Sequence, residues 1–289
     1  MTTIGIIGGS GVYELDGLEN VQEVTMETPF GAPSDKLITG DLEGTRLVFI
    51  PRHGRGHRHL PSEVPYRANI FALKASGAEM VISVSAVGSM KEEVKPGDFL
   101  IPNQYIDRTM GRAQTFFGGG IVAHVSAANP VCPHLAGHLA GFVRECDVTC
   151  HPSGTYICME GPAFSTRGES LMYRQWGVDV IGMTAMPEAK LAREAELHYA
   201  TLALSTDYDC WHEGEADVSV DAVLATLKQN TQNVKRVLSH ALPRLGEKMA
   251  QSDACECPTA LAHAFMTNPE LIPNERKEAL APRINKYFS

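Results

Sequence analysis

The chain has 289 residues, of which 44% are hydrophobic, and a formal net charge of -9. This length and apolar content are enough for one substantial core, so a single domain is expected. The net negative charge disfavours binding to nucleic acid or to an anionic membrane, because both surfaces attract clustered Lys and Arg. The N-terminus lacks the pattern of a signal peptide, and no apolar run is long enough to span a bilayer. We expect a cytoplasmic protein that binds a small molecule.

Short apolar runs alternate with helical patterns along the chain. Runs rich in β-branched residues predict strands at 4–7, 47–50, 80–84, 99–101, 156–158, 178–181 and 200–204. Helices are predicted between them at 66–76, 134–145, 169–176 and 187–197. This alternation predicts an α/β fold with a mixed or parallel sheet surrounded by helices.

The last part of the chain has a different pattern. Apolar residues spaced three and four apart predict a long amphipathic helix from Ser219, which Pro243 is expected to end. After Gln251, turn-forming residues separate short helical stretches. We interpret 1–250 as a single α/β domain and 251–289 as its C-terminal helical extension.

A glycine-rich loop, Gly8-Gly9-Ser10-Gly11, follows the first predicted strand. Its backbone N–H groups and hydroxyl suit a phosphate, although an ordinary turn between a strand and a helix has the same composition. The loop lacks the third glycine of a dinucleotide fingerprint, since Glu14 stands there. A nicotinamide-dependent dehydrogenase is therefore disfavoured.

A cationic segment, 51–59, follows the second predicted strand. The Arg52 guanidinium could grip phosphate oxygens in a bidentate manner, and a solvated basic loop is the alternative. The segment also holds His53, His57 and His59, but no carboxylate or thiolate cluster accompanies them. The seven cysteines show no repeated zinc-ligand spacing and are interpreted as mostly buried thiols. We therefore expect no metal site.

Two further polar segments follow predicted strands. Small residues at 85–89 could bring backbone amides and hydroxyls to an oxygen-rich ligand, or could form a plain turn. Asp207 and Asp209 project to the same side if the strand before them continues. Their proximity would raise the pKa of at least one carboxyl, which could then donate a proton to a leaving group. A solvated acidic loop is the alternative.

Taken together, these segments resemble the trimeric purine nucleoside phosphorylase family. The resemblance also rests on Glu160-Gly161-Pro162-Ala163-Phe164-Ser165 and on Cys210-Trp211, and it runs from about Ile4 to Leu242. It implies a nucleoside phosphorylase fold with a central mixed sheet, partly closed into a barrel and surrounded by helices. It also implies a homotrimer or a dimer of trimers, and a pentosyltransferase with inorganic phosphate as co-substrate and no cofactor.

The resemblance assigns roles to individual residues. Phosphate contacts are implied for Ser10, Arg52, His53, Ser85, Ala86 and Thr184. Base and sugar contacts are implied for Phe164, Ser165, Met183, Thr206, Asp207 and Asp209. Asp207 would protonate the purine at N7, and Asp209 would accept a hydrogen bond from a 6-amino group. Around the 5' end, the resemblance implies His124, Val220 and Leu224 from a neighbouring subunit, although ordinary helix packing explains the last two equally well.

The implied reaction is phosphorolysis of S-methyl-5'-thioadenosine to adenine and 5-methylthioribose 1-phosphate, in methionine and purine salvage. A phosphorylase for 6-oxopurine nucleosides or methylthioinosine is one alternative, and a non-catalytic nucleoside-binding protein is another. Two departures bear on assembly and 5' specificity. Ala163 stands where some relatives carry Arg, and the tail is long, with a Cys255-Glu256-Cys257 segment.

Overall fold

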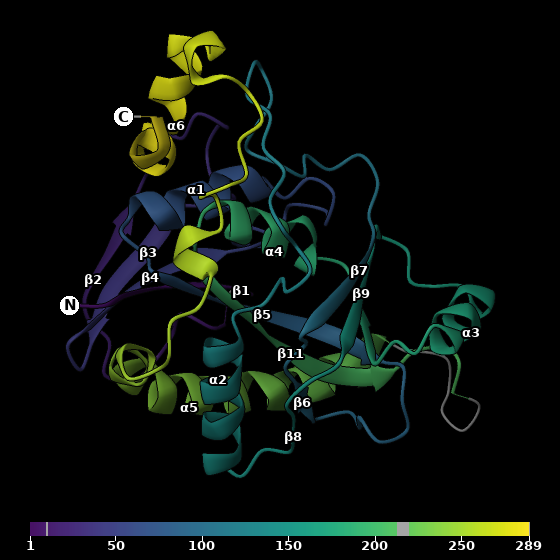
Figure 1. Cartoon of the computed structure of the whole chain (residues 1–289). Coiled ribbons are helices and arrows are strands. Elements are labelled where there is room, and N and C mark those ends of the chain that lie inside the picture. The colour runs from purple at the N-terminus through teal and green to yellow at the C-terminus, as the bar shows by residue number, and fades with distance from the viewer. Residues whose placement is uncertain (10, 213–219, 289) are drawn as a thin grey trace.

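The computed structural model describes residues 1–9, 11–212 and 220–288, without the side chains of 220–225, 281–285 and 288. Its centre is a mixed sheet of eleven strands (Figure 1). The strands are β1 (Thr3–Gly8), β2 (Glu19–Val24), β3 (Leu37–Leu42), β4 (Thr45–Pro51), β5 (Met80–Ser89), β6 (Phe99–Leu100), β7 (Gln104–Arg108), β8 (Cys150–His151), β9 (Thr155–Met159), β10 (Val180–Gly182) and β11 (His198–Tyr208).

Strand β5 is the centre of this sheet because three strands pair with it. It runs parallel to β1 and β11 and antiparallel to β10. The sheet therefore branches at β5, with the path β2-β3-β4-β1-β5-β10-β9-β7 and a second arm through β11, β6 and β8. The pairings recorded for the described residues do not close a ring. The partly barrel-like sheet expected from the resemblance is thus an open, branched sheet.

Helices cover both faces of the sheet. They are α1 (Tyr66–Ala75), α2 (Pro133–Glu145), α3 (Arg167–Gln175), α4 (Ala185–Glu194), α5 (Val220–Ala250) and α6 (Asn274–Phe288). Figure 1 shows α1 and α4 on one side of the central strands and α2 and α5 on the other. The side chains of β1 alternate between these layers, as a strand requires. Ile4 and Ile6 belong to the core with α2 and α5, whereas Ile7 belongs to the core with α1 and α4.

The strands that sequence reasoning missed have polar or half-exposed patterns. β2 is exposed along almost its whole length and lies at an edge of the sheet, so it has no apolar signature. β7 is half-buried in its middle and exposed at both ends, and β8 has only two residues. β3 is mostly buried, but Thr39, Gly40 and Asp41 interrupt its apolar pattern. Backbone pairing with neighbouring strands, which no local pattern encodes, fixes all four.

The expectation that Pro243 ends the long helix is wrong. Helix α5 continues to Ala250 with Pro243 inside it. The proline removes one backbone hydrogen bond, but the apolar face of α5 continues past it. Leu242 and Leu245, on either side of the proline, are both fully buried in the core. Burial of these side chains outweighs the local preference of proline for a helix end.

The segment after α5 folds back over the domain. It contains the short helices η1 (Cys257–Thr259) and η2 (Pro269–Leu271) before α6. Leu261 and Leu280 are buried in the core on the α1 and α4 side. Figure 1 shows α6 on the same side of the sheet as α1 and α4. Within the described part of the chain, no helix is both long enough and apolar enough to cross a membrane.

Candidate active site

A cavity of about 540 Å³ lies where the parallel strands β1, β4, β5 and β11 end. Its wall includes Gly8 and Gly9 after β1, Pro51 to Gly54 after β4, and Val84 to Gly88 in β5. Parallel strands bring their carboxyl ends to one edge of a sheet, where ligands typically bind. The cavity is therefore built from segments that are far apart in sequence.

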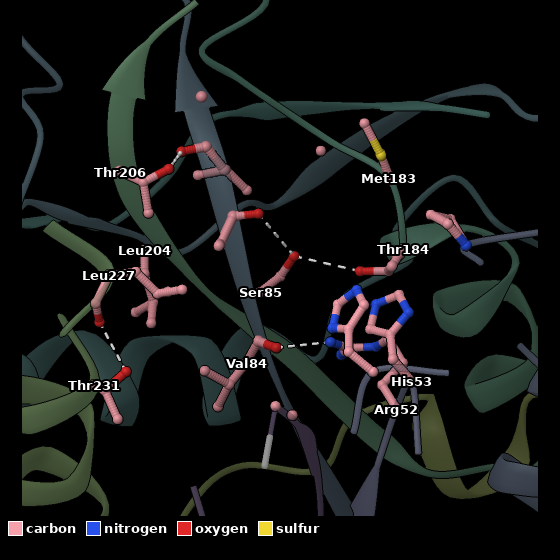
Figure 2. Close-up of a pocket in the computed structure, with 18 of the residues that line it drawn as sticks. Arg52, His53, Val84, Ser85, Met183, Thr184, Leu204, Thr206, Leu227 and Thr231 are labelled. Atoms are coloured by element: carbon pink, nitrogen blue, oxygen red, sulfur yellow. Dashed lines mark hydrogen bonds between the residues drawn. The ribbon is translucent and has the colours of Figure 1, made fainter. Parts of the chain in front are cut away.

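One end of the cavity is rich in hydroxyl groups. The Ser85 Oγ lies 3.4 Å from the Thr184 Oγ1 and 3.3 Å from the Tyr156 hydroxyl. Figure 2 shows Ser85 and Thr184 facing each other, with Arg52 and His53 below Thr184. Ala86 is exposed, whereas Ser85 and Val87 on either side of it are buried, and it lines the cavity. Hydroxyls and a guanidinium at one end suit an oxyanion.

The Arg52 guanidinium is buried at this end and held by several elements. Its Nε donates to the Glu188 Oε2 of α4 at 3.0 Å, and its Nη1 donates to the Val84 carbonyl at 2.8 Å. Its Nη2 donates to the Ser83 Oγ at 2.8 Å. Glu188, which is 1% exposed, also accepts a hydrogen bond from the Tyr199 hydroxyl of β11. Arg52 is therefore rigidly oriented from β5, α4 and β11.

His53 lies beside Arg52 and is neutral near pH 7, because burial lowers the pKa of its imidazole to about 4. Its Nδ1 lies 2.8 Å from the His59 carbonyl oxygen, so Nδ1 carries the proton. The ring stacks on His57, with the centroids 4.3 Å apart. With His53 neutral, the positive group beside it is the guanidinium of the Arg52–Glu188 ion pair.

The other polar end of the cavity carries two carboxylates. The half-buried Asp207 accepts a hydrogen bond from the Thr206 hydroxyl at 2.6 Å. Asp209 is 5% exposed, and its Oδ2 is buried without a hydrogen-bond partner among the described residues. Burial raises the pKa of the Asp209 carboxyl. Gly88 makes room for the pair, because a Cβ there would lie 3.3 Å from the Asp207 Oδ2.

Apolar side chains form the wall between the two polar ends. Met183 and Phe164 line the cavity, and Phe164 remains 64% exposed. Gly161 has a φ of +71°, and a Cβ there would lie 2.6 Å from the Met183 Sδ. Only glycine therefore lets this loop approach Met183 so closely. On the opposite wall, Figure 2 shows Leu204 beside Leu227 and Thr231.

Most residues that the resemblance assigned to the site line this one cavity: Arg52, His53, Ser85, Ala86, Phe164, Met183, Thr184, Thr206, Asp207 and Asp209. Ser165 does not line the cavity. Its Oγ contacts the Sδ of Met159, and Met159 does line the cavity. His124 is exposed outside the cavity, and its backbone N–H donates to the Ala264 carbonyl.

Three assigned residues cannot be located in this way. Ser10 and the side chains of Val220 and Leu224 lie outside the described residues. Leu227 and Thr231 of the same α5 line the cavity of their own chain. A contribution of His124, Val220 and Leu224 from a neighbouring subunit stays a prediction.

Sequence reasoning missed residues that support the site through α4 and α5. Glu188 was placed only within a helical pattern, although it neutralises Arg52. The apolar pattern places Leu227 and Val234 on one face of the long helix and does not single out Thr231, but all three line the cavity. Their spacing of four and three residues is the signal of one helix face, and that signal does not distinguish a core from a ligand.

The chain matches the phosphorylase superfamily over residues 3–243. It therefore belongs to that superfamily, and the fold class expected from the resemblance is confirmed. An S-methyl-5'-thioadenosine phosphorylase of Geobacter sulfurreducens is 56% identical over 285 residues, which cover 98% of each chain.

Two solved structures are similar to the whole chain. A methylthioadenosine phosphorylase from an antarctic soil metagenomic library is 49% identical, with a TM-score of 0.91, and the match covers 97% of this chain and 98% of that one. A methylthioadenosine phosphorylase from Schistosoma mansoni in complex with adenine is 34% identical, with a TM-score of 0.82, and the match covers 92% and 99%.

The buried ion pair predicts a large difference between two arginines of one loop. Arg52→Ala leaves Glu188 buried without its partner, so the free energy of unfolding should fall by about 3–5 kcal/mol. Arg55→Ala is the matched control. The Arg55 side chain is 41% exposed, and Asp35 keeps Arg58 at 3.6 Å when Arg55 is removed, so the loss should be far smaller. Urea denaturation followed by circular dichroism measures both. Equal losses would contradict the structural role of the buried pair.

Proposed function

We propose that this chain uses inorganic phosphate to cleave S-methyl-5'-thioadenosine into adenine and 5-methylthioribose 1-phosphate. The observation that carries the proposal is that one cavity has both polar ends. Its oxyanion end lies at Arg52, Ser85 and Thr184, and its carboxylate end lies at Asp207 and Asp209. The similarity to S-methyl-5'-thioadenosine phosphorylases supports the 5'-methylthio substrate, and the adenine complex of the similar protein from Schistosoma mansoni supports the base.

The oxyanion end binds phosphate. The hydroxyls of Ser85 and Thr184 and the Arg52 guanidinium donate hydrogen bonds to its oxygens, with Ala86, His53 and Ser10 completing the group. Binding there directs a phosphate oxygen toward the anomeric carbon of the sugar, which Met183 contacts. Glycosidic cleavage develops positive charge on the sugar, and the bound phosphate stabilises it.

The carboxylate end binds the purine. Negative charge develops on the departing base, so a proton delivered to N7 lowers the barrier. Asp207 supplies that proton, and the hydroxyl of Thr206 fixes its orientation at 2.6 Å. The Oδ2 of Asp209 has no hydrogen-bond donor among the described residues, which supports recognition of adenine, because a 6-amino group supplies a donor. Phe164 and Ser165 border the base and sugar.

The 5' end of the site is completed in a homo-oligomer, a trimer or a dimer of trimers. His124 is exposed and available to a neighbouring subunit, which supports this arrangement. Val220 and Leu224 provide apolar contacts to the methylthio group. Such an enzyme acts in the cytoplasm in methionine and purine salvage, and the seven free cysteines support a reducing compartment.

Purified protein should release adenine from S-methyl-5'-thioadenosine only when inorganic phosphate is present. Chromatographic measurement of the free base, with methylthioinosine and inosine run in parallel, tests the reaction and the base preference together. Faster release of hypoxanthine would transfer the assignment to a 6-oxopurine phosphorylase. Binding without phosphate-dependent release would support a non-catalytic nucleoside-binding protein.

Asp207→Asn should lower kcat by about 100- to 10,000-fold, since an amide is a poor proton donor. The KM for nucleoside should change less, because the amide still fits beside Thr206. Asp16→Asn is the control, since Asp16 is an exposed carboxylate that does not line the cavity. Steady-state kinetics with saturating phosphate measures both variants. An unchanged kcat in Asp207→Asn would refute its role as proton donor.

Asp209→Asn should reduce the preference for adenine over hypoxanthine substrates by about 5- to 150-fold, which corresponds to about 1–3 kcal/mol for one hydrogen bond. The new amide can rotate to donate to a 6-oxo group. In the unmodified protein, the raised pKa of Asp209 keeps its proton to higher pH. The preference for adenine should therefore widen as the pH rises and the carboxylate ionises. If the preference for adenine is the same in the variant and does not change with pH, Asp209 does not recognise the 6-amino group.

A further inference from the structure

Three cysteines and a histidine from distant parts of the sequence meet outside the cavity. They are Cys132 at the N-terminus of α2, His198 at the start of β11, and Cys255 and Cys257 in the segment after α5. Their three Sγ atoms and one imidazole nitrogen all lie within 4.8 Å of one another. None of the four residues lines the candidate active site. The phosphorolysis proposed above therefore gives them no role.

The spacing of these atoms is close to that of a tetrahedral metal site. A zinc ion bound by sulfur at about 2.3 Å and by nitrogen at about 2.0 Å holds its ligand atoms about 3.5–3.8 Å apart. The His198 Nδ1 lies 3.2 Å from the Cys132 Sγ and 3.5 Å from the Cys255 Sγ. The imidazole thus presents one nitrogen to the sulfur atoms, as a zinc ligand must.

A buried guanidinium lies beside the four residues. Three thiolates and one divalent cation would leave a net charge of -1. The buried Arg193 side chain places a positive charge beside this site, because its Nη1 lies 3.6 Å from the Cys257 Sγ. Its Nη2 pairs with Glu256, whose side chain points outward between the two cysteines.

Two of the four ligands are fixed by the core before any metal binds. The Cys132 backbone N–H donates to the Tyr199 carbonyl at 2.9 Å, and the His198 N–H donates to the Glu79 carbonyl at 3.1 Å. These bonds hold both residues next to the sheet. Cys255 and Cys257 belong to the tail, so a metal at this cluster would join the tail to the core.

We propose that Cys132, His198, Cys255 and Cys257 bind one structural zinc ion that fastens the C-terminal extension to the α/β domain. Zinc fits because three thiolates and an imidazole form a closed, tetrahedral donor set, and soft sulfur ligands disfavour magnesium and calcium. This departs from the sequence expectation of no metal site. The four ligands stand at 132, 198, 255 and 257, and these separations do not form a recognisable sequence motif.

The first test is the metal content of the full-length protein, purified without metal-affinity resin and without chelators. Inductively coupled plasma mass spectrometry should find one zinc per chain. Where less is found, the reduced protein is titrated anaerobically with zinc chloride or cobalt chloride. Cobalt should then give thiolate charge-transfer bands and the visible bands of a tetrahedral ion. Failure to bind either metal overturns the proposal.

Paired variants separate metal binding from packing. Cys255→Ser should lose the zinc, whereas Cys255→His should retain it, because histidine is also a zinc ligand. If Cys255 only packed against its neighbours, zinc content would not depend on which residue replaces it. Cys150→Ser is the control, since Cys150 is a half-buried cysteine outside the cluster. A strong chelator should lower the Tm of the unmodified protein and of Cys150→Ser, but not that of Cys255→Ser.

A disulfide within the cluster is the competing outcome. Thiol titration of the protein, denatured without reductant and with a chelator present, should count all seven cysteines. A count of five would show one disulfide and overturn the proposal. Loss of zinc with full phosphorolysis would leave the proposed function intact, so the two proposals fail independently.

Discussion

The buried ion pair between Arg52 and Glu188 joins the elements on which the site depends. Arg52 follows β4 and donates to the backbone of β5, while Glu188 belongs to α4 and accepts from Tyr199 of β11. Both side chains are almost completely buried, at 3% and 1% exposure. A charge in such surroundings requires its partner, because removing either one leaves an uncompensated ion in the core. The position of the oxyanion end is therefore coupled to the integrity of the fold.

The two polar ends of the cavity differ in how far their polar groups already have hydrogen-bond partners within the described protein. At the oxyanion end, Nε, Nη1 and Nη2 of Arg52 each donate to a protein acceptor, which orients the guanidinium before a ligand arrives. At the carboxylate end, the Oδ2 of Asp209 is buried and has no hydrogen-bond partner in the part of the chain that the structure describes. An unmatched buried acceptor costs free energy that a ligand donor recovers on binding. Under the proposed function, this asymmetry gives the carboxylate end the greater part in selecting the substrate, while the oxyanion end fixes the geometry of attack.

Sequence reasoning located the polar segments because each follows a buried strand with a clear apolar pattern. β1, β4, β5 and β11 were all found in this way, and their carboxyl ends carry the loops that line the cavity. The sequence does not predict edge strand β2, because its side chains are exposed along almost the whole strand. Pro243 predicts a helix end that the structure does not have, because burial of the side chains around it outweighs the preference of proline for a helix end. Glu188 gave no local signal, since its partner stands 136 residues away. The residues of α5 showed a helix face, but not what that face contacts.

The cysteine cluster shows the same limit in its strongest form. Local spacing reveals a metal site when the ligands lie on one turn or hairpin, as in a repeated Cys-x-x-Cys. Here only Cys255 and Cys257 lie close together in sequence. The other two ligands come from the start of helix α2 and the start of strand β11. The same β11 carries His198 at one end and Asp207 at the other. A tail fastened at His198 therefore contacts β11 at the end opposite to Asp207, the carboxylate proposed to protonate the base.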